Sequence, residues 1–157
     1  MKTLILALGN PILSDDRVGW EIADRLAARL PADAFDILKE SGATFDLVRR
    51  ISEYDRLILI DAIQLGTAPL GTLHRFTLED FQSSIRHSSA HDINFATALE
   101  MGRQMGYGIP ADIRIYGVEV KELRHFSESL TPEIAGKVDE IAEAIFQDLL
   151  PLPGPAT

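Results

Sequence analysis

The 157-residue chain contains no cysteine. Disulfide bonds, thiolate metal sites and cysteine nucleophiles are therefore excluded. The chain also lacks any apolar run approaching the roughly 20 residues that a membrane-spanning helix needs. Its N-terminal apolar stretch, Leu4–Leu8, is too short for the apolar segment of a signal peptide. These absences favour a cytoplasmic protein without a membrane span.

Basic residues are also scarce, because 15 Lys and Arg stand against 24 Asp and Glu, for a formal net charge of −9. Nucleic acids and anionic membrane surfaces attract basic proteins, so this balance argues against both as partners. Apolar residues make up 46% of the chain, as in an ordinary globular protein. We expect one domain over residues 1–150, followed by a flexible C-terminal tail over residues 151–157.

Signatures of several common enzyme classes are missing as well. Gly9 follows the first apolar run, but Asn10 and Pro11 come next, where a dinucleotide-binding loop needs G-x-G-x-x-G. The acids later in this loop would also repel a phosphate group. No P-loop, H-E-x-x-H or G-x-S-x-G pattern occurs in the chain. The sequence therefore gives no support to nucleotide binding or to these hydrolase classes.

The apolar patterns that are present predict alternating strands and helices. Strands are expected at residues 3–8, 34–38, 56–63, 70–77 and 112–120. Helices are expected at residues 18–30, 44–51, 92–105 and 132–149, the last one capped by Thr131 and begun by Pro132. Residues 83–91 are polar and aperiodic, which predicts a loop. The alternation predicts an α/β fold, a three-layer αβα sandwich around a mostly parallel sheet of about five strands.

Two adjacent acids, Asp15 and Asp16, follow the first predicted strand. Ligands of open α/β sheets bind beyond the carboxyl ends of the strands, so this loop is a candidate site. The alternative is structural, because Ser14 and the acids can cap the next helix and complement its dipole. One acid is enough for a cap, which leaves the second one available for another role.

Asp61 and His91 are the other candidates. Asp61 ends the apolar run Leu57–Ile60, where an acid binds a ligand, takes part in catalysis or caps a turn. His91 lies in the predicted loop just before a helix, where it is either a ligand or simply exposed. An acid of the opening pair, Asp61 and His91 form a plausible site for Zn, Ni, Fe or Mn. The remaining histidines carry weaker signals: His74, His87 and His125.

Several segments, taken in order, resemble the hydrogenase maturation peptidases, which trim the C-terminus of the large subunit of [NiFe] hydrogenases. The segment "ILALGNPILSDDRVGWEIADRL" is similar to the family's opening strand, G-N-x-L-x-x-D-[DE]-x-x-G loop and helix. The segment "SGATFDLV" resembles its Gly-Gly-Thr segment, and "LILIDAI" its strand ending in Asp-Ala. The segment "SSAHDINFATAL" resembles the stretch with its histidine, and "IYGVEVKEL" and "SESLTPEI" its closing strand and last helix. The resemblance covers nearly the whole chain.

This resemblance implies a fold of the phosphorylase/hydrolase-like type and an endopeptidase that the family classification calls aspartic-type. The substrate would be a hydrogenase large-subunit precursor, cut after nickel has been inserted. By position, Asp16, Asp61 and His91 would bind that nickel, which the substrate supplies, and other divalent metals can occupy such a site in vitro. Asp16 and Asp61 would also be the catalytic residues. The peptide would be held by Ser41, Gly42 and Thr44.

Two departures from the family pattern stand out. Ala43 replaces the second glycine of the Gly-Gly-Thr segment, and Asp16 is one methylene shorter than the Glu of some members. The chemistry also stays open between a carboxylate that acts as general base and a nickel that polarises the carbonyl. Two other functions remain possible on the same residues: a non-catalytic, chaperone-like nickel-binding module, and an unrelated metal-dependent hydrolase of small amides.

Overall fold

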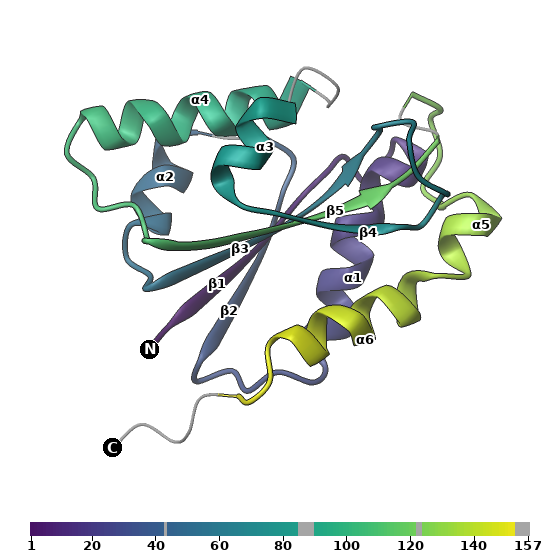
Figure 1. The fold of residues 1–157 in the computed structure, drawn as a ribbon, viewed down its shortest axis with the longest axis horizontal. Helices are drawn as coiled ribbons and strands as arrows, with labels where there is room; N and C mark the ends of the chain where they lie inside the picture. The colour runs from purple at the N-terminus through teal and green to yellow at the C-terminus, as the bar shows by residue number, and fades with distance from the viewer. Residues whose placement is uncertain (43, 85–89, 122–123, 153–157) are drawn as a thin grey trace.

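Five strands form one mixed sheet in the order β2-β1-β3-β5-β4 (Figure 1). They are β1 (Thr3–Leu8), β2 (Phe35–Glu40), β3 (Arg56–Ile63), β4 (Leu73–Phe76) and β5 (Asp112–Glu119). The edge strand β4 is antiparallel to β5, and all other neighbours are parallel. The computed structural model describes residues 1–42, 44–84, 90–121 and 124–152, with only the backbone given for residues 84 and 90–94. The predicted α/β fold with a mostly parallel five-stranded sheet is confirmed.

Helices cover both faces of this sheet (Figure 1). They are the 3₁₀ turn η1 (Ser14–Arg17), α1 (Val18–Ala27), α2 (Phe45–Ile51), α3 (Leu78–Ser84), α4 (Ala90–Gln104), α5 (Pro132–Ala135) and α6 (Val138–Asp148). One apolar core lies between the sheet and α1, α5 and α6. A second core lies on the opposite face, under α2, α3 and α4. None of the helices in the described part of the chain is long and apolar enough to cross a bilayer.

The central strands are apolar on both faces, as strands covered by helices on two sides must be. Every residue of β1 and β3 is buried. Leu57 and Leu59 point into the core under α2 and α4, whereas Ile58 and Ile60 point into the core under α1 and α6. The continuous apolar runs that predicted both strands are therefore explained by helices on each side.

The prediction around β4 was partly wrong. The strand spans four residues instead of the expected 70–77, and helix α3 begins directly after it. Thr77 explains this helix, because its Oγ1 accepts a hydrogen bond of 3.1 Å from the backbone N–H of Asp80. That contact is an N-cap, and the sequence Thr-Leu-Glu-Asp is typical of one.

Three helix boundaries also differ from the prediction. The first helix ends at Ala27, yet Leu30 is still buried, so the apolar repeat runs past the helix end. The expected C-terminal helix is divided into α5 and α6 at Gly136, a weak helix former. Helix α4 begins at Ala90, so His91 lies in its first turn and not in a loop. Residues 85–89, most of the predicted loop, and residues 153–157 of the predicted tail lie outside the described residues.

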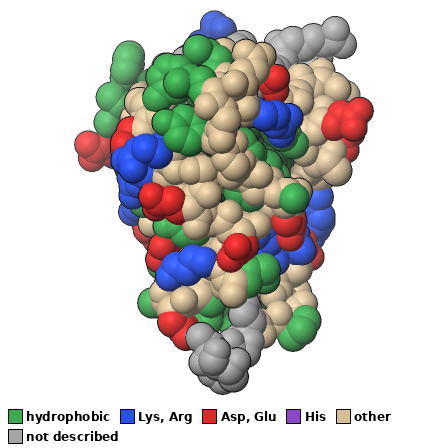
Figure 2. Space-filling view, turned by 90° about the vertical axis from the view of Figure 1, so that its left-hand side faces the viewer, with side chains coloured by type: hydrophobic (Ala, Val, Ile, Leu, Met, Phe, Trp, Pro, Cys, Tyr) green, Lys and Arg blue, Asp and Glu red, His purple; other side chains and the backbone are tan. Residues whose placement is uncertain are grey.

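Acidic and basic side chains alternate over the face shown in Figure 2. No continuous basic stripe crosses this face (Figure 2). Apolar side chains gather at its upper end, at the level of α4 (Figures 1 and 2). Met101, in the last turn of α4, and Met105, just after the helix, are among the exposed large apolar residues of the protein. This end of α4 lies far from the carboxyl ends of the parallel strands (Figure 1).

Candidate active site

The strand order creates a topological switch point at the carboxyl edge of the sheet. The chain leaves β1 through α1 on one face to reach β2, and then passes through α2 on the other face to reach β3, on the far side of β1. Neighbouring strands whose connections leave in opposite directions form a topological switch point, where open α/β sheets bind ligands. In this protein that point lies between the ends of β1 and β3.

Gly9 lets the loop after β1 fold back tightly against the strand end. A Cβ on Gly9 would lie 2.1 Å from the backbone oxygen of Asp16, so no other residue fits without moving η1. The backbone N–H of Asn10 donates a 3.0 Å hydrogen bond to Oδ2 of Asp16. Oδ1 of Asn10 accepts from the N–H of Ile12 at 3.1 Å, which closes a local Asx turn. Gly9 and Asn10 thus fix the position and orientation of the buried Asp16 carboxylate.

Gly19 brings the first turn of α1 onto the strand ends. A Cβ at this position would lie 2.8 Å from the backbone oxygen of Ile60 and 3.3 Å from that of Leu8. Ile60 immediately precedes Asp61, so this close approach holds η1 beside the end of β3. Gly9 and Gly19, the two glycines of the opening motif, therefore both bring Asp16 toward the end of β3, where Asp61 lies.

Asp61 is 2% exposed and lies two residues before the end of the eight-residue strand β3. Its Oδ1 accepts a hydrogen bond of 2.9 Å from the backbone N–H of Ala62. Because side chains alternate along a strand, Asp61 points to the same face as Leu57 and Leu59, the face that α4 covers. The structure thus places Asp16 and Asp61, predicted separately from the sequence, at one edge of the sheet.

Helix α4 runs back across this face, so that its N-terminal end lies toward the carboxyl edge of the sheet (Figure 1). His91 is the second residue of the helix. The helix is held against the sheet by the buried side chains of Phe95 and Leu99. The backbone of His91 is therefore at the correct end of α4 to approach Asp61, while its side chain lies outside the described residues.

The predicted peptide-binding segment follows β2 at the same edge. Ser41 is exposed and Gly42 is partly exposed. Oγ1 of Thr44 accepts from the backbone N–H of Leu47 at 3.2 Å, which makes Thr44 the N-cap of α2. Ala43, the departure from the Gly-Gly-Thr pattern, lies outside the described residues.

Asp15 has a different role from its neighbour. It is fully buried, and its carboxylate accepts three hydrogen bonds of 2.8–3.0 Å from the backbone N–H and hydroxyl of Thr131. Neither η1 nor α1 has a side-chain hydrogen bond from its N-cap residue. The expected side-chain cap is therefore absent, although both acids lie in the first turn of η1, and Asp15 links the opening loop to the start of α5. Thr131, expected to cap that helix, makes no side-chain cap and bonds Asp15 instead.

A second contact between these distant segments supports the loop from outside. Leu13 and Ser127 form an isolated parallel bridge, with Ser127 N–H donating to Ile12 at 2.9 Å. The Arg17 guanidinium donates to the backbone oxygens of Pro11 and Glu128 at 2.9 and 2.6 Å. The loop that carries Asp16 is therefore held on both sides by hydrogen bonds.

Sequence reasoning missed a pair on the neighbouring strands, formed by a buried glutamate and a partly buried histidine. Glu119, the last residue of β5, is 2% exposed, and its Oε1 lies 3.1 Å from Nε2 of His74 on β4. Its Oε2 accepts from the backbone N–H groups of Leu65 and Gly66 at 3.0 and 3.3 Å. The signal in the sequence was the one used for Asp61, an acid at the end of an apolar strand. His74 could be linked to it only after β4 had been paired with β5.

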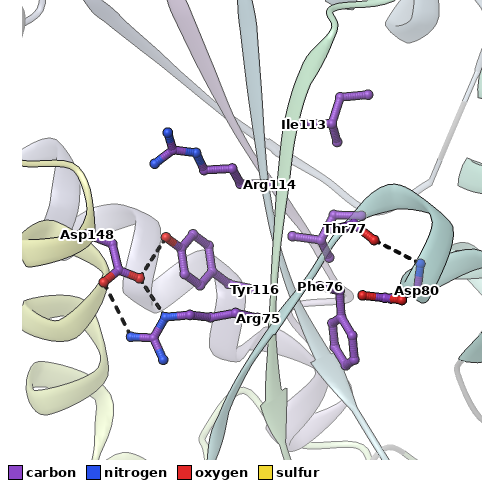
Figure 3. A pocket seen from close by; sticks show the side chains of 9 residues that line it. Arg75, Phe76, Thr77, Asp80, Ile113, Arg114, Tyr116 and Asp148 are labelled. Atoms are coloured by element: carbon purple, nitrogen blue, oxygen red, sulfur yellow. Dashed lines mark hydrogen bonds and ion pairs between the residues drawn. The ribbon is translucent and has the colours of Figure 1, made fainter.

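A hollow of about 400 Å³ lies elsewhere, between β4, β5 and the end of α6 (Figure 3). Asp148 binds there to Nε of Arg75 at 2.6 Å and to the Tyr116 hydroxyl at 3.0 Å. The hydrogen bond from Arg75 holds the pKa of Asp148 below its usual range. Burial and the bond to Asp148 raise the pKa of Tyr116 to about 12. The charges of Arg75 and Asp148 therefore neutralise one another in this hollow.

Comparison with known proteins decides the family. The family model described as "Hydrogenase maturation protease" matches residues 20–148, most of the chain. The chain belongs to the hydrogenase maturation proteases. The match includes Asp61 and His91 and begins just after the loop that carries Asp16. The protease is therefore an endopeptidase by family, and the resemblance found in its sequence is confirmed.

Individual relatives agree with this assignment. The protease is 30% identical over 149 residues to the hydrogenase expression/formation protein HupD of Rhodobacter capsulatus, an alignment that spans 92% of this chain and 70% of the relative. It is 28% identical over 153 residues to the hydrogenase 2 maturation protease of Escherichia coli, across 95% of this chain and 91% of the relative.

Solved structures agree as well. The hydrogenase maturating endopeptidase HybD from E. coli superposes with a TM-score of 0.80 at 28% identity, over 95% of this chain and 92% of that one. HybD from Thermococcus kodakarensis gives a TM-score of 0.77 at 25% identity, over 94% of this chain and 98% of that one. The fold that holds Asp16 and Asp61 at one edge is thus the fold of known maturation endopeptidases.

Proposed function

We propose that the protease removes the C-terminal extension of a [NiFe] hydrogenase large-subunit precursor after nickel has been inserted. The observation that carries this proposal is the pair of buried carboxylates, Asp16 and Asp61, at the switch point between β1 and β3. Membership of the family supplies the substrate class.

We infer that Asp16, Asp61 and His91 bind the nickel that the precursor carries. Carboxylate oxygens and imidazole nitrogen are suitable ligands for Ni²⁺, and other divalent metals can bind the same set in vitro. Backbone hydrogen bonds from Asn10 and Ala62 hold the two carboxylates in fixed orientations, which favours binding of an ion that arrives with the substrate. In this proposal the nickel belongs to the substrate, and its presence reports that the precursor is ready to be cut.

The cleavage itself needs a water molecule and two proton transfers. The water oxygen bonds to the scissile carbonyl carbon while a carboxylate, Asp16 or Asp61, accepts the water proton. The C–N bond then breaks, and the amine leaves with a proton. The substrate's nickel positions the scissile bond and can polarise its carbonyl. Ser41, Gly42 and Thr44, at the same edge, are proposed to hold the peptide.

The decisive experiment measures the intact mass of a matched large-subunit precursor after incubation with the protease. Nickel-loaded precursor is expected to lose a C-terminal peptide, whereas nickel-free precursor keeps its full mass. Asp16→Asn, Asp61→Asn and His91→Ala variants are expected to lower the rate by at least about 100-fold, as when a general base is removed. Full activity of all three variants would contradict the proposal. An uncut nickel-loaded precursor would favour a nickel-binding module without peptidase activity.

A further inference from the structure

The pair of buried Glu119 and partly buried His74 lies close to the candidate site on the sheet. Asp61 of β3 is in register with Gly117 of β5, which is in register with His74 of β4. Residues in one row of a sheet point to the same face, so His74 shares the face of Asp61. Glu119, two residues beyond Gly117, also points to this face, at the carboxyl edge.

Glu119 holds the segment that leaves β3. Its Oε2 receives two successive backbone N–H groups, those of Leu65 and Gly66. Gly66 has a φ of +75°, a left-handed conformation that favours glycine and turns the chain just after these two N–H groups. Gln64 adds a third tie, because its Nε2 donates to the backbone oxygen of Lys121 at 2.5 Å. The segment Gln64–Gly66, which begins three residues after Asp61, is thus bound to the end of β5.

A buried carboxylate stabilises a core less well than an apolar side chain of the same size. Glu119 is 2% exposed, and taking its charge out of water is unfavourable unless hydrogen bonds compensate. An apolar pair of similar volume often gives equal or greater stability. What such a pair does not provide is an acceptor for the N–H groups of Leu65 and Gly66. The polar pair is therefore suited to fix this backbone in place.

We propose that Glu119 and His74 are positioning residues for the substrate. Glu119, oriented by His74, fixes the segment Gln64–Gly66 as a wall of the cleft beside Asp61, against which the extended C-terminal peptide of the precursor lies. A preformed wall lowers the entropic cost of binding that peptide. This inference rests on the proposed cleavage of a hydrogenase precursor.

The test compares steady-state cleavage of nickel-loaded precursor by the wild type and by Glu119→Gln and His74→Leu variants. Each variant is expected to raise KM by about 5- to 20-fold with kcat within about twofold, because the lost contacts order the binding surface and do not touch reacting atoms. His74→Gln, which keeps a side-chain N–H toward Glu119, is expected to remain closer to the wild-type KM. Glu100→Gln, an exposed change on α4, is the matched control.

Amide hydrogen exchange gives a second measurement that needs no substrate. The Leu65 and Gly66 amides are expected to exchange at least about 10-fold faster in Glu119→Gln, with the amides of β3 unchanged. The double variant His74→Leu/Glu119→Met separates positioning from stability. The single variants are expected to melt at a lower temperature than the wild type. The double variant is expected to melt at the wild-type temperature but to keep a raised KM.

Recovery of both properties in the double variant would show a purely structural role and overturn the inference. Wild-type KM and exchange in Glu119→Gln would do the same. If the wild type itself does not cut the precursor, the proposed function fails and this inference fails with it. Normal cleavage by all variants would contradict the inference alone.

Discussion

At the scale of single residues, two neighbouring acids have separate tasks. Asp15 accepts the hydrogen bonds of Thr131, whereas Asp16 is oriented by Asn10 at the end of β1. Both are buried, so burial does not distinguish them. Their partners do, because Thr131 opens the C-terminal helices and Asn10 belongs to the candidate site. The motif thus combines a structural acid with one that we propose to be functional.

Asp15→Asn is expected to lower the free energy of unfolding by about 1–3 kcal/mol, because the amide loses charge-assisted hydrogen bonds and places an N–H₂ group against donors. Cleavage per folded molecule is expected to stay within a few-fold of the wild type. Urea denaturation and the precursor assay measure the two quantities.

Asp16→Asn is the matched neighbour and is expected to show the reverse, with cleavage lost and stability changed less. If Asp15→Asn kept full stability but abolished cleavage by the folded protein, the division of tasks would be wrong.

The sequence predicted Asp16 and Asp61 as site candidates because each acid comes after an apolar run. Glu119 also ends an apolar strand, but the sequence does not show what it binds, because its partners are remote in the chain. His74 is 45 residues away, and Leu65 and Gly66 are 54 and 53 residues away. Single residues at strand ends can be recognised from sequence, whereas networks across strands require the register of the sheet.

At the scale of elements, η1 and the start of α1 depend on backbone contact with the sheet. Gly9 and Gly19 touch backbone oxygens so closely that a methyl group would displace the helix start. The helix itself was predicted from its apolar repeat, but this approach was not. The position of Asp16 therefore depends on two glycines, whose lack of a side chain permits these close backbone contacts.

Gly9→Ala is expected to destabilise the fold by about 1–3 kcal/mol, the usual cost of overpacking, because its Cβ would collide with the Asp16 backbone oxygen. Cleavage is expected to fall with it, since η1 must shift. Thermal unfolding and the precursor assay report both effects.

Gly108→Ala is the control, because a Cβ there would meet no atom within 4 Å. Equal behaviour of the two variants would rule out the contact as the reason for Gly9.

At the scale of the whole molecule, two tyrosines link the strands to other elements. Tyr116 joins β5 to α6 through Asp148, and Tyr54 reaches Asp36 on β2 at 2.6 Å. Burial, followed by the hydrogen bond to a carboxylate, raises the pKa of each tyrosine to about 12. The folded protein therefore keeps two protons that the unfolded chain releases near pH 10.

Stability is expected to fall as pH rises from about 10 to about 12, because the folded state binds more protons than the unfolded state in this range. The contribution is fully present below pH 10. In Tyr116→Phe one of the two titrating groups is gone, so urea midpoints should fall less steeply over this range, although the variant starts about 1 kcal/mol less stable at neutral pH.

A Tyr54→Phe/Tyr116→Phe double variant should flatten the curve further. An unchanged slope in both variants would show that other groups cause the alkaline loss of stability.

The sequence by itself determined the elements and the individual acids. Apolar runs specify β1 and β3, the apolar repeat specifies α1, and acids after strands mark Asp16 and Asp61, because these signals depend only on near neighbours in the chain. The apolar pattern alone did not predict every element. It missed the start of α3 after Thr77 and the break between α5 and α6 at Gly136.

The tertiary structure alone decided how these parts meet. The order β2-β1-β3-β5-β4 places the ends of β1 and β3 side by side, and so makes one site from loops about 45 residues apart. It also assigns Asp15 to Thr131, 116 residues away. Such pairings follow from the crossing of helices over opposite sheet faces and from close backbone contacts, and neither leaves a local pattern in the sequence.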